Sequence, residues 1–146
     1  MPLPEPVPGL VIRYAYLWFG EYAAGQEEGV KDRPCAIVAA IRSDEDGNTR
    51  VLVLPITHTP PRSGEDAIEI PQAVKARLGL DADRSWVVLS EWNEFTWPGP
   101  DLRRPLGADA ASVAYGVLPP RLFTSIRDRF LTLAGVRKAR RVTRTE

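Results

Sequence analysis

Two side chains in this sequence stand out for the chemistry that they could do. His58 is the only histidine, and imidazole is the side chain whose ordinary pKa lies near neutral pH, so it could exchange protons with a substrate. Arg33 carries a planar guanidinium that stays charged at any working pH and can hold two phosphate oxygens at once. Plainer interpretations exist for both: His58 as a loop histidine without a role, and Arg33 in a surface ion pair with Asp32 or Glu28.

The sequence lacks the residue sets that hold most metals or a disulfide framework. Cys35 is the only cysteine, which excludes an internal disulfide and a Cys-rich zinc site. A single histidine also excludes the HExxH and Cys/His zinc motifs, because each needs at least two such ligands. Asp44, Asp46 and Asn48 are spaced like the start of a calcium loop, but Thr49 stands where that loop requires glycine. We therefore expect no metal and no cofactor.

Charge is distributed unevenly along a chain whose net charge is zero. Residues 1–102 hold nine Lys and Arg against sixteen Asp and Glu, a balance of −7, and residues 103–146 hold ten against three, a balance of +7. A basic terminal segment is typical of proteins that bind phosphate backbones. It is equally typical of a solvated tail, or of a segment that pairs with an acidic surface of the same fold or of a protein partner.

Length and composition indicate one folded domain. The chain has 146 residues, of which 44% are hydrophobic and 26% charged, which suits a globular protein and argues against wholesale disorder. No apolar stretch approaches the ~20 residues needed to span a bilayer. Residues 1–10 have neither the basic nor the apolar region of a secretion signal. We expect a cytoplasmic protein without membrane contact.

The apolar pattern predicts a mainly β, β-rich α+β fold. Runs of β-branched and aromatic residues predict strands, apolar residues at steps of three or four predict helices, and Asp46-Gly47 predicts a tight hairpin turn. The predicted strands cover 11–19, 35–42, 50–56, 67–71 and 85–95, the predicted helices 71–80 and 119–134, the predicted surface loop 19–32, and the predicted rigid turn 97–105. We expect a small, closed or half-closed antiparallel barrel over 9–135, between a Pro-rich extended segment over 1–8 and a basic tail over 136–146.

Three segments carry a resemblance to a known family. They are residues 25–38, 53–58 and 86–91. Arg33-Pro34 heads one strand of the predicted hairpin and Pro55-Ile56-Thr57 ends the next, and in this order and spacing the sequence resembles the PemK/MazF family of toxins from type II toxin–antitoxin systems. The resemblance covers roughly residues 9–133. It implies a small SH3-like barrel, usually a homodimer, that acts as a metal-independent, sequence-specific endoribonuclease on single-stranded RNA and is neutralised by a cognate antitoxin.

The resemblance implies roles for Arg33, Thr57 and Glu91, whereas His58 is a candidate because its ordinary pKa lies near neutral pH and it directly follows Thr57. Arg33 and Thr57 would hold the scissile phosphate, and His58 and Glu91 are the candidates for proton transfer. The substrate-binding candidates are Gln26, Glu27, Pro34, Trp92 and Trp97. Exposed aromatic side chains beside basic residues could stack unpaired bases; alternatively, these aromatics close one end of the barrel or form a dimer interface.

Two positions depart from the pattern of some family members. Leu89 stands where those members have an arginine that serves as acid, and Gln26 stands where certain members have a histidine. Either His58 and Arg33 cover the missing roles, or the protein is a non-catalytic barrel that binds RNA or a peptide. A toxin directed at DNA or gyrase is a third possibility, which no residue selects.

Overall fold

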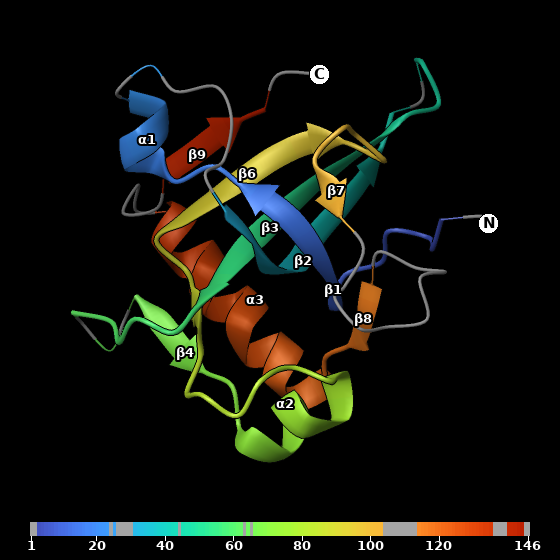
Figure 1. Cartoon of the computed structure of the whole chain (residues 1–146). Coiled ribbons are helices and arrows are strands. Elements are labelled where there is room, and N and C mark those ends of the chain that lie inside the picture. The colour runs from blue at the N-terminus through green and yellow to red at the C-terminus, as the bar shows by residue number, and fades with distance from the viewer. Residues whose placement is uncertain are drawn as a thin grey trace.

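Nine strands joined in one sheet, together with three helices, make up the part of the chain that the structure describes (Figure 1). The computed structural model describes residues 3–23, 25, 31–43, 45–62, 64, 66–103, 114–135 and 140–144. The strands are β1 (Leu10–Tyr16), β2 (Lys31–Arg42), β3 (Thr49–Thr57), β4 (Ala67–Glu69), β5 (Trp86–Val88), β6 (Glu91–Thr96), β7 (Leu102–Arg103), β8 (Ala114–Val117) and β9 (Arg140–Thr143), and the helices are α1 (Phe19–Ala23), α2 (Gln72–Leu78) and α3 (Pro120–Gly135). The predicted mainly β, β-rich α+β fold is confirmed.

The strands β1, β2 and β3 form the centre of the sheet as antiparallel neighbours. The β2–β3 hairpin turns at the predicted Asp46-Gly47, because Gly47 adopts the left-handed φ of 71° that a tight turn needs. The Ser43 amide donates to the Asn48 carbonyl at 2.8 Å and closes the turn. Beyond β3 lie β5 with β4 and, separately, β6 with β9; beyond β1 lie β7 and β8. Among the described strands, β6 and β9 form the one parallel pair.

Successive residues of the central strands enter two apolar cores, one on each face of the sheet. In β1, Val11 belongs to the core that contains Ile126 and Phe130 of α3, the helix that crosses one face (Figure 1). The next residue, Ile12, belongs to the second core, with Phe95. Because side chains alternate along a strand and both faces are buried, the middle of β2 and of β3 is a continuous apolar run, over residues 34–41 and 51–56.

The two predicted helices are confirmed. The helix α2 ends at Gly79, whose φ of 73° is the left-handed conformation that glycine accepts at a helix end. The helix α3 buries Ile126, Phe130 and Leu133, which lie at the spacing of one helical face. In the described part of the chain, no helix is both long and apolar enough to cross a membrane.

The prediction of one strand over 85–95 is wrong, because the chain changes partners in its middle. Residues 86–88 pair with β3 and β4, whereas β6 pairs with a different stretch of β3 and with β9. At the junction, the Leu89 amide donates to the Asp66 carbonyl at 2.7 Å, and the Ser90 carbonyl accepts from the Arg140 amide at 2.8 Å. Two short strands therefore replace one.

The predicted surface loop over 19–32 contains regular structure at both of its ends. It begins with α1, at whose start the Glu21 carboxylate accepts from the Trp18 amide at 3.1 Å, a contact that satisfies a donor before the first helical turn. It ends with the first residues of β2. The predicted strand over 11–19 correspondingly stops at Tyr16.

Part of the basic tail is built into the sheet. The strand β9 lies beside β6, and its Val142 is 0% exposed, so residues 140–144 match the interpretation of a segment that pairs within its own fold. At the other end, residues 3–7 form neither helix nor strand, and Leu3 and Val7 are exposed, as expected for the Pro-rich segment.

Gly99, in the turn after β6, is a position where we expect a side chain to be costly. Its φ is +62°, and an added Cβ would lie 2.9 Å from Phe95 Cδ2 and 3.2 Å from the Thr96 carbonyl oxygen. Phe95 is 1% exposed and stacked on Tyr14, so its ring has little room to move. We expect Gly99→Ala to lower the free energy of unfolding by about 1–3 kcal/mol in urea denaturation.

Gly20 in α1 provides the matched control for that substitution. An added Cβ there meets nothing within 4 Å, so Gly20→Ala should leave stability unchanged or raise it by up to ~1 kcal/mol. Equal stability of Gly99→Ala and the wild type would contradict the packing described for the turn.

Candidate functional site

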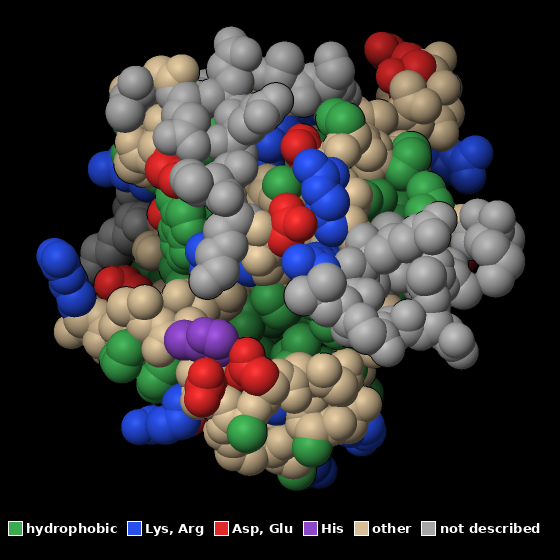
Figure 2. Space-filling view, in the orientation of Figure 1, with side chains coloured by type: hydrophobic (Ala, Val, Ile, Leu, Met, Phe, Trp, Pro, Cys, Tyr) green, Lys and Arg blue, Asp and Glu red, His purple; other side chains and the backbone are tan. Residues whose placement is uncertain are grey.

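A cleft of about 420 Å³ opens where the start of β2 and the end of β3 meet the segment that follows α2. Its lining mixes charged, polar and apolar side chains, among them Arg33, Pro34, His58, Lys75, Asp81 and Tyr115. In Figure 2 the histidine lies against acidic side chains, and Lys and Arg side chains gather farther up the same face. Three of the predicted site residues, Arg33, Pro34 and His58, therefore share one cleft.

Arg33 has no carboxylate partner among the described residues. Its guanidinium carbon lies 4.9 Å from the ring centroid of Trp18, and its Nε is buried without a hydrogen-bond partner. The plainer interpretation paired Arg33 with Asp32 or Glu28. The Asp32 carboxylate instead lies 3.7 Å from the guanidinium of Arg13 and 3.6 Å from that of Arg103. Glu28 falls outside the described residues. Arg33 thus carries a stacked, half-buried charge that no carboxylate neutralises within the part of the chain that the structure describes.

The end of β3 directs consecutive side chains into two neighbouring cavities. Ile56 and His58 line the cleft, whereas Thr57 lines a second pocket of about 400 Å³ together with Trp18, as the alternation of side chains along a strand requires. The Thr57 hydroxyl accepts a hydrogen bond from the Thr59 amide at 3.2 Å. Trp18 links the two cavities, because it lines the second pocket and stacks against Arg33 of the first.

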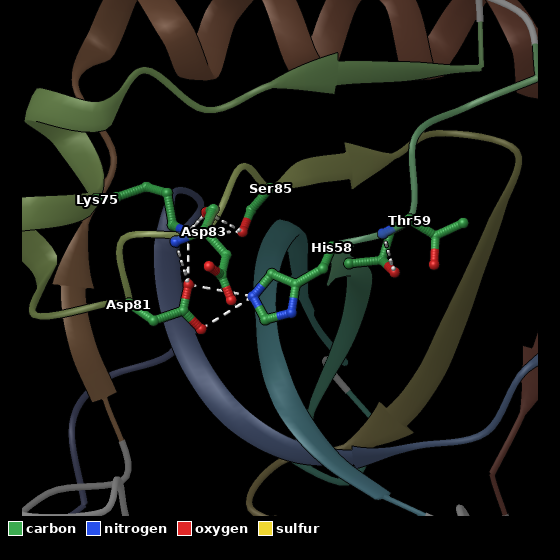
Figure 3. Close-up of polar contacts among 7 residues, drawn as sticks. His58, Thr59, Lys75, Asp81, Asp83 and Ser85 are labelled. Atoms are coloured by element: carbon green, nitrogen blue, oxygen red, sulfur yellow. Dashed lines mark hydrogen bonds and ion pairs between the residues drawn. The ribbon is translucent and has the colours of Figure 1, made fainter.

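The His58 imidazole forms a hydrogen bond with the carboxylate of Asp81, a residue that the sequence analysis did not single out. The imidazole Nε2 lies 2.9 Å from Asp81 Oδ2, and the side chains are 52% and 54% exposed (Figure 3). Lys75 from α2 donates to Asp81 Oδ1 at 2.8 Å. This bond is the largest reason why the pKa of Asp81 lies below its ordinary value of 3.8.

A local signal for this network was present in α2. The buried residues of this helix are Lys75 and Leu78, three positions apart on one helical face, so a lysine stands where an apolar residue is expected. A lysine on a buried face must find acceptors, and the nearest candidates in sequence follow the helix at residues 81–85. Nothing local indicates that His58, 23 positions away from Asp81, completes the contact.

Glu91, the second predicted proton-transfer residue, is engaged inside the fold. Its Oε1 accepts from the Phe19 amide at 2.9 Å and from the Tyr16 hydroxyl at 3.1 Å, and it is not among the residues that line either cavity. Burial of the carboxylate raises its pKa above the ordinary 4.5, although both hydrogen bonds act in the opposite direction. These contacts join β6 to the last residue of β1 and the first residue of α1.

The raised pKa of Glu91 predicts a pH-dependent stability difference. Since the folded protein binds this proton more tightly than the unfolded chain, ionisation costs stability as pH rises from about 4.5 through the folded pKa. Glu91→Gln keeps an acceptor oxygen and removes that cost. We therefore expect the variant to gain stability relative to wild type over that window, measured as urea midpoints between pH 4 and pH 8.

The exposed Glu45 in the β2–β3 turn supplies a control for the loss of one carboxylate. The Glu45→Gln variant should follow the wild-type curve. A wild type that instead gains stability over Glu91→Gln as pH rises would show that the Glu91 carboxylate stabilises the fold.

The remaining substrate-binding candidates do not gather at the cleft. Trp92 packs against the core that contains α3, with its ring 5.2 Å from that of Phe130. Trp97 packs against the other core, 6.2 Å from Phe95. This arrangement fits the alternative in which the aromatics have a structural role, and each of the two tryptophans packs against a different core. Gln26 and Glu27 lie outside the described residues.

One group of residues has the composition of a metal site but not its electrostatics. The potential ligand atoms of His58, Asp81 and Asp83 lie within 4.8 Å of one another, and all three residues are exposed. The Lys75 ammonium already neutralises Asp81, so we assign no metal to this group.

Comparisons of the chain with protein-family models, with curated proteins and with solved structures gave no match.

Proposed function

We propose that this protein is a metal-independent endoribonuclease that cuts single-stranded RNA, as the toxin of a type II toxin–antitoxin pair. The observation that carries the proposal is Arg33, a guanidinium at the cleft with no carboxylate partner among the described residues. A half-buried charge without a counter-charge favours an anionic ligand. The phosphate of RNA would supply two oxygens in the geometry that a guanidinium matches.

Thr57 and His58 would complete the phosphate site from the end of β3. The Thr57 hydroxyl accepts from the Thr59 amide, which leaves its own proton for a non-bridging phosphate oxygen. Thr57 would bind the phosphate from the neighbouring pocket, and Arg33 in the cleft would stabilise the charge that builds on phosphorus in the transition state. His58 lines the same cleft as Arg33 and would act as the base.

The proposed reaction is a transfer of the phosphodiester to the 2′-oxygen. His58 accepts the proton of the 2′-hydroxyl, the 2′-oxygen forms a bond to phosphorus, and the bond from phosphorus to the 5′-oxygen breaks. The leaving 5′-oxygen takes a proton from solvent, and His58 returns its own proton to solvent. The products are a 2′,3′-cyclic phosphate and a 5′-hydroxyl. Glu91 takes no part in this reaction, because its Oε1 accepts hydrogen bonds from the Tyr16 hydroxyl and the Phe19 amide.

The family resemblance supports the partners in this proposal. They are single-stranded RNA, a second copy of the chain, and a cognate antitoxin whose acidic segment occupies the RNA groove. Such a pair acts in the cytoplasm, where its RNA substrates are.

Incubation of the purified protein with long single-stranded RNA in EDTA tests the proposal. We expect discrete fragments with cyclic phosphate at their 3′ ends. Several transcripts of varied sequence are needed, because a sequence-specific enzyme leaves any RNA without its site intact. Intact RNA across the whole set would contradict the proposal.

A second candidate is a non-catalytic RNA-binding module on the same fold. Two observations favour it: Leu89 is fully buried in the core and supplies no acid, and Glu91 is engaged in the fold. This module would bind RNA with an affinity that falls as salt rises, and it would leave every transcript intact.

A further inference from the structure

Lys75 is a buried lysine whose ammonium protons are all used. Its side chain is 1% exposed, and Nζ donates to Asp81 Oδ1 at 2.8 Å, to Ser85 Oγ at 2.7 Å and to the carbonyl of Asp83. A buried ammonium is tolerated only where it is paired and hydrogen-bonded. Since all three acceptors lie between residues 81 and 85, Lys75 fixes the conformation of the segment that follows α2.

That segment presents Asp81 to His58. The Asp81 Oδ1 also accepts from the Asp83 amide at 3.1 Å, so three donors, from Lys75, Asp83 and the imidazole, converge on one carboxylate (Figure 3). The imidazole Nε2 lies 2.9 Å from Oδ2 and 3.1 Å from Oδ1. A surface contact of this exposure contributes little to stability, which leaves orientation of the imidazole as its main effect.

We propose that Asp81, fixed by Lys75, positions His58 for proton transfer in RNA cleavage; this inference rests on the function proposed above. A carboxylate against Nε2 keeps that nitrogen protonated, so Nδ1 is the atom that accepts the proton of the 2′-hydroxyl. The imidazolium formed in this step is paired with Asp81 until it returns the proton to solvent. His58 is then the catalytic residue, and Asp81 and Lys75 are positioning residues.

The other charged groups near His58 are placed differently. The Asp83 carboxylate is close to the pair, and Arg13, Asp32 and Arg33 line the same cleft. Among the described residues, Asp81 is the charged group whose hydrogen bond to the imidazole the structure shows. Removal of the Asp81 carboxylate therefore acts on the imidazole of His58 and also frees Lys75, and the His58→Ala background separates these two effects.

Single-turnover cleavage of one RNA that the wild type cuts, measured in EDTA, tests the inference. We expect Asp81→Asn to lower the rate about 10- to 100-fold, less than the ~10²–10⁴-fold that a general base itself contributes, without changing the protein concentration at half-saturation. In a His58→Ala background the same substitution should have no further effect. Glu69→Gln is the control, because it removes an exposed carboxylate that is paired with Arg84 instead.

Each outcome decides between the two proposals. Uncut RNA with the wild type would overturn the nuclease and the positioning role together. Cleavage by Asp81→Asn at the wild-type rate would overturn the positioning role alone. A further loss of rate when Asp81→Asn is added to His58→Ala would also overturn the positioning role. A folding defect caused by freeing Lys75 lowers the rate whether or not His58 is present, whereas a positioning effect requires His58.

Discussion

Replacing Arg33 with alanine is expected to slow RNA cleavage by about 10²–10³-fold, the range that one preorganised transition-state donor supplies. The guanidinium has no carboxylate to neutralise it among the described residues and stands at the cleft beside Trp18, so its charge is available to the phosphate. Arg33→Lys should recover only part of the activity, because a lysine keeps the charge but loses the planar fork and much of the stacking. Rates are measured on RNA in EDTA, and growth arrest on induction gives a second readout.

Stability should change little in Arg33→Ala. Loss of the contact with Trp18 lowers the free energy of unfolding by about 0.5–1 kcal/mol. Removal of the Nε, which is buried without a hydrogen-bond partner, relieves a desolvation cost that compensates for this loss. Arg84 is the matched control, since it also stacks on a tryptophan, with its guanidinium carbon 5.1 Å from the ring of Trp86, and is paired with Glu69 on the surface. Arg84→Ala should retain cleavage and growth arrest. If the wild type and Arg33→Ala are equally harmless on induction, the nuclease proposal fails.

Replacing Arg144 with methionine is expected to destabilise the fold by about 3–5 kcal/mol, the cost of breaking a buried ion pair from one side. The Arg144 side chain is 2% exposed, and its guanidinium lies 3.1 Å from Asp101, which is 14% exposed. It also donates to the Ala15 carbonyl at 2.6 Å and to Asn93 Oδ1 at 3.1 Å. One side chain thus joins the C-terminal segment to β1, β6 and the turn before β7.

Urea denaturation of Arg144→Met measures this effect, and Arg141→Met is its control. Arg141 is exposed on the neighbouring strand β9, so its replacement should change stability by no more than about 0.5 kcal/mol. A loss below ~1 kcal/mol in Arg144→Met would mean that the C-terminal segment contributes little to the folded state.

The candidate site was only partly predictable. Arg33, Pro34 and His58 do line one cleft, and the motifs that named them lie at the ends of hairpin strands, which a tight turn holds in register. Glu91 was named from its position in the family's pattern and the two tryptophans from their residue type, and neither reveals which way a side chain faces. In the structure Glu91 accepts hydrogen bonds from Tyr16 and Phe19, and Trp92 and Trp97 pack against different cores.

The sequence by itself determined the elements whose signal lies within one short window. The β2–β3 turn at Gly47 and the end of α2 at Gly79 follow from the left-handed conformations that glycine adopts there, and α3 follows from the periodicity of its apolar residues. Only the tertiary structure decided which distant residues meet. His58 contacts Asp81 across 23 positions and Arg144 contacts Tyr14 across 130, because such contacts depend on how elements pack and not on any local pattern.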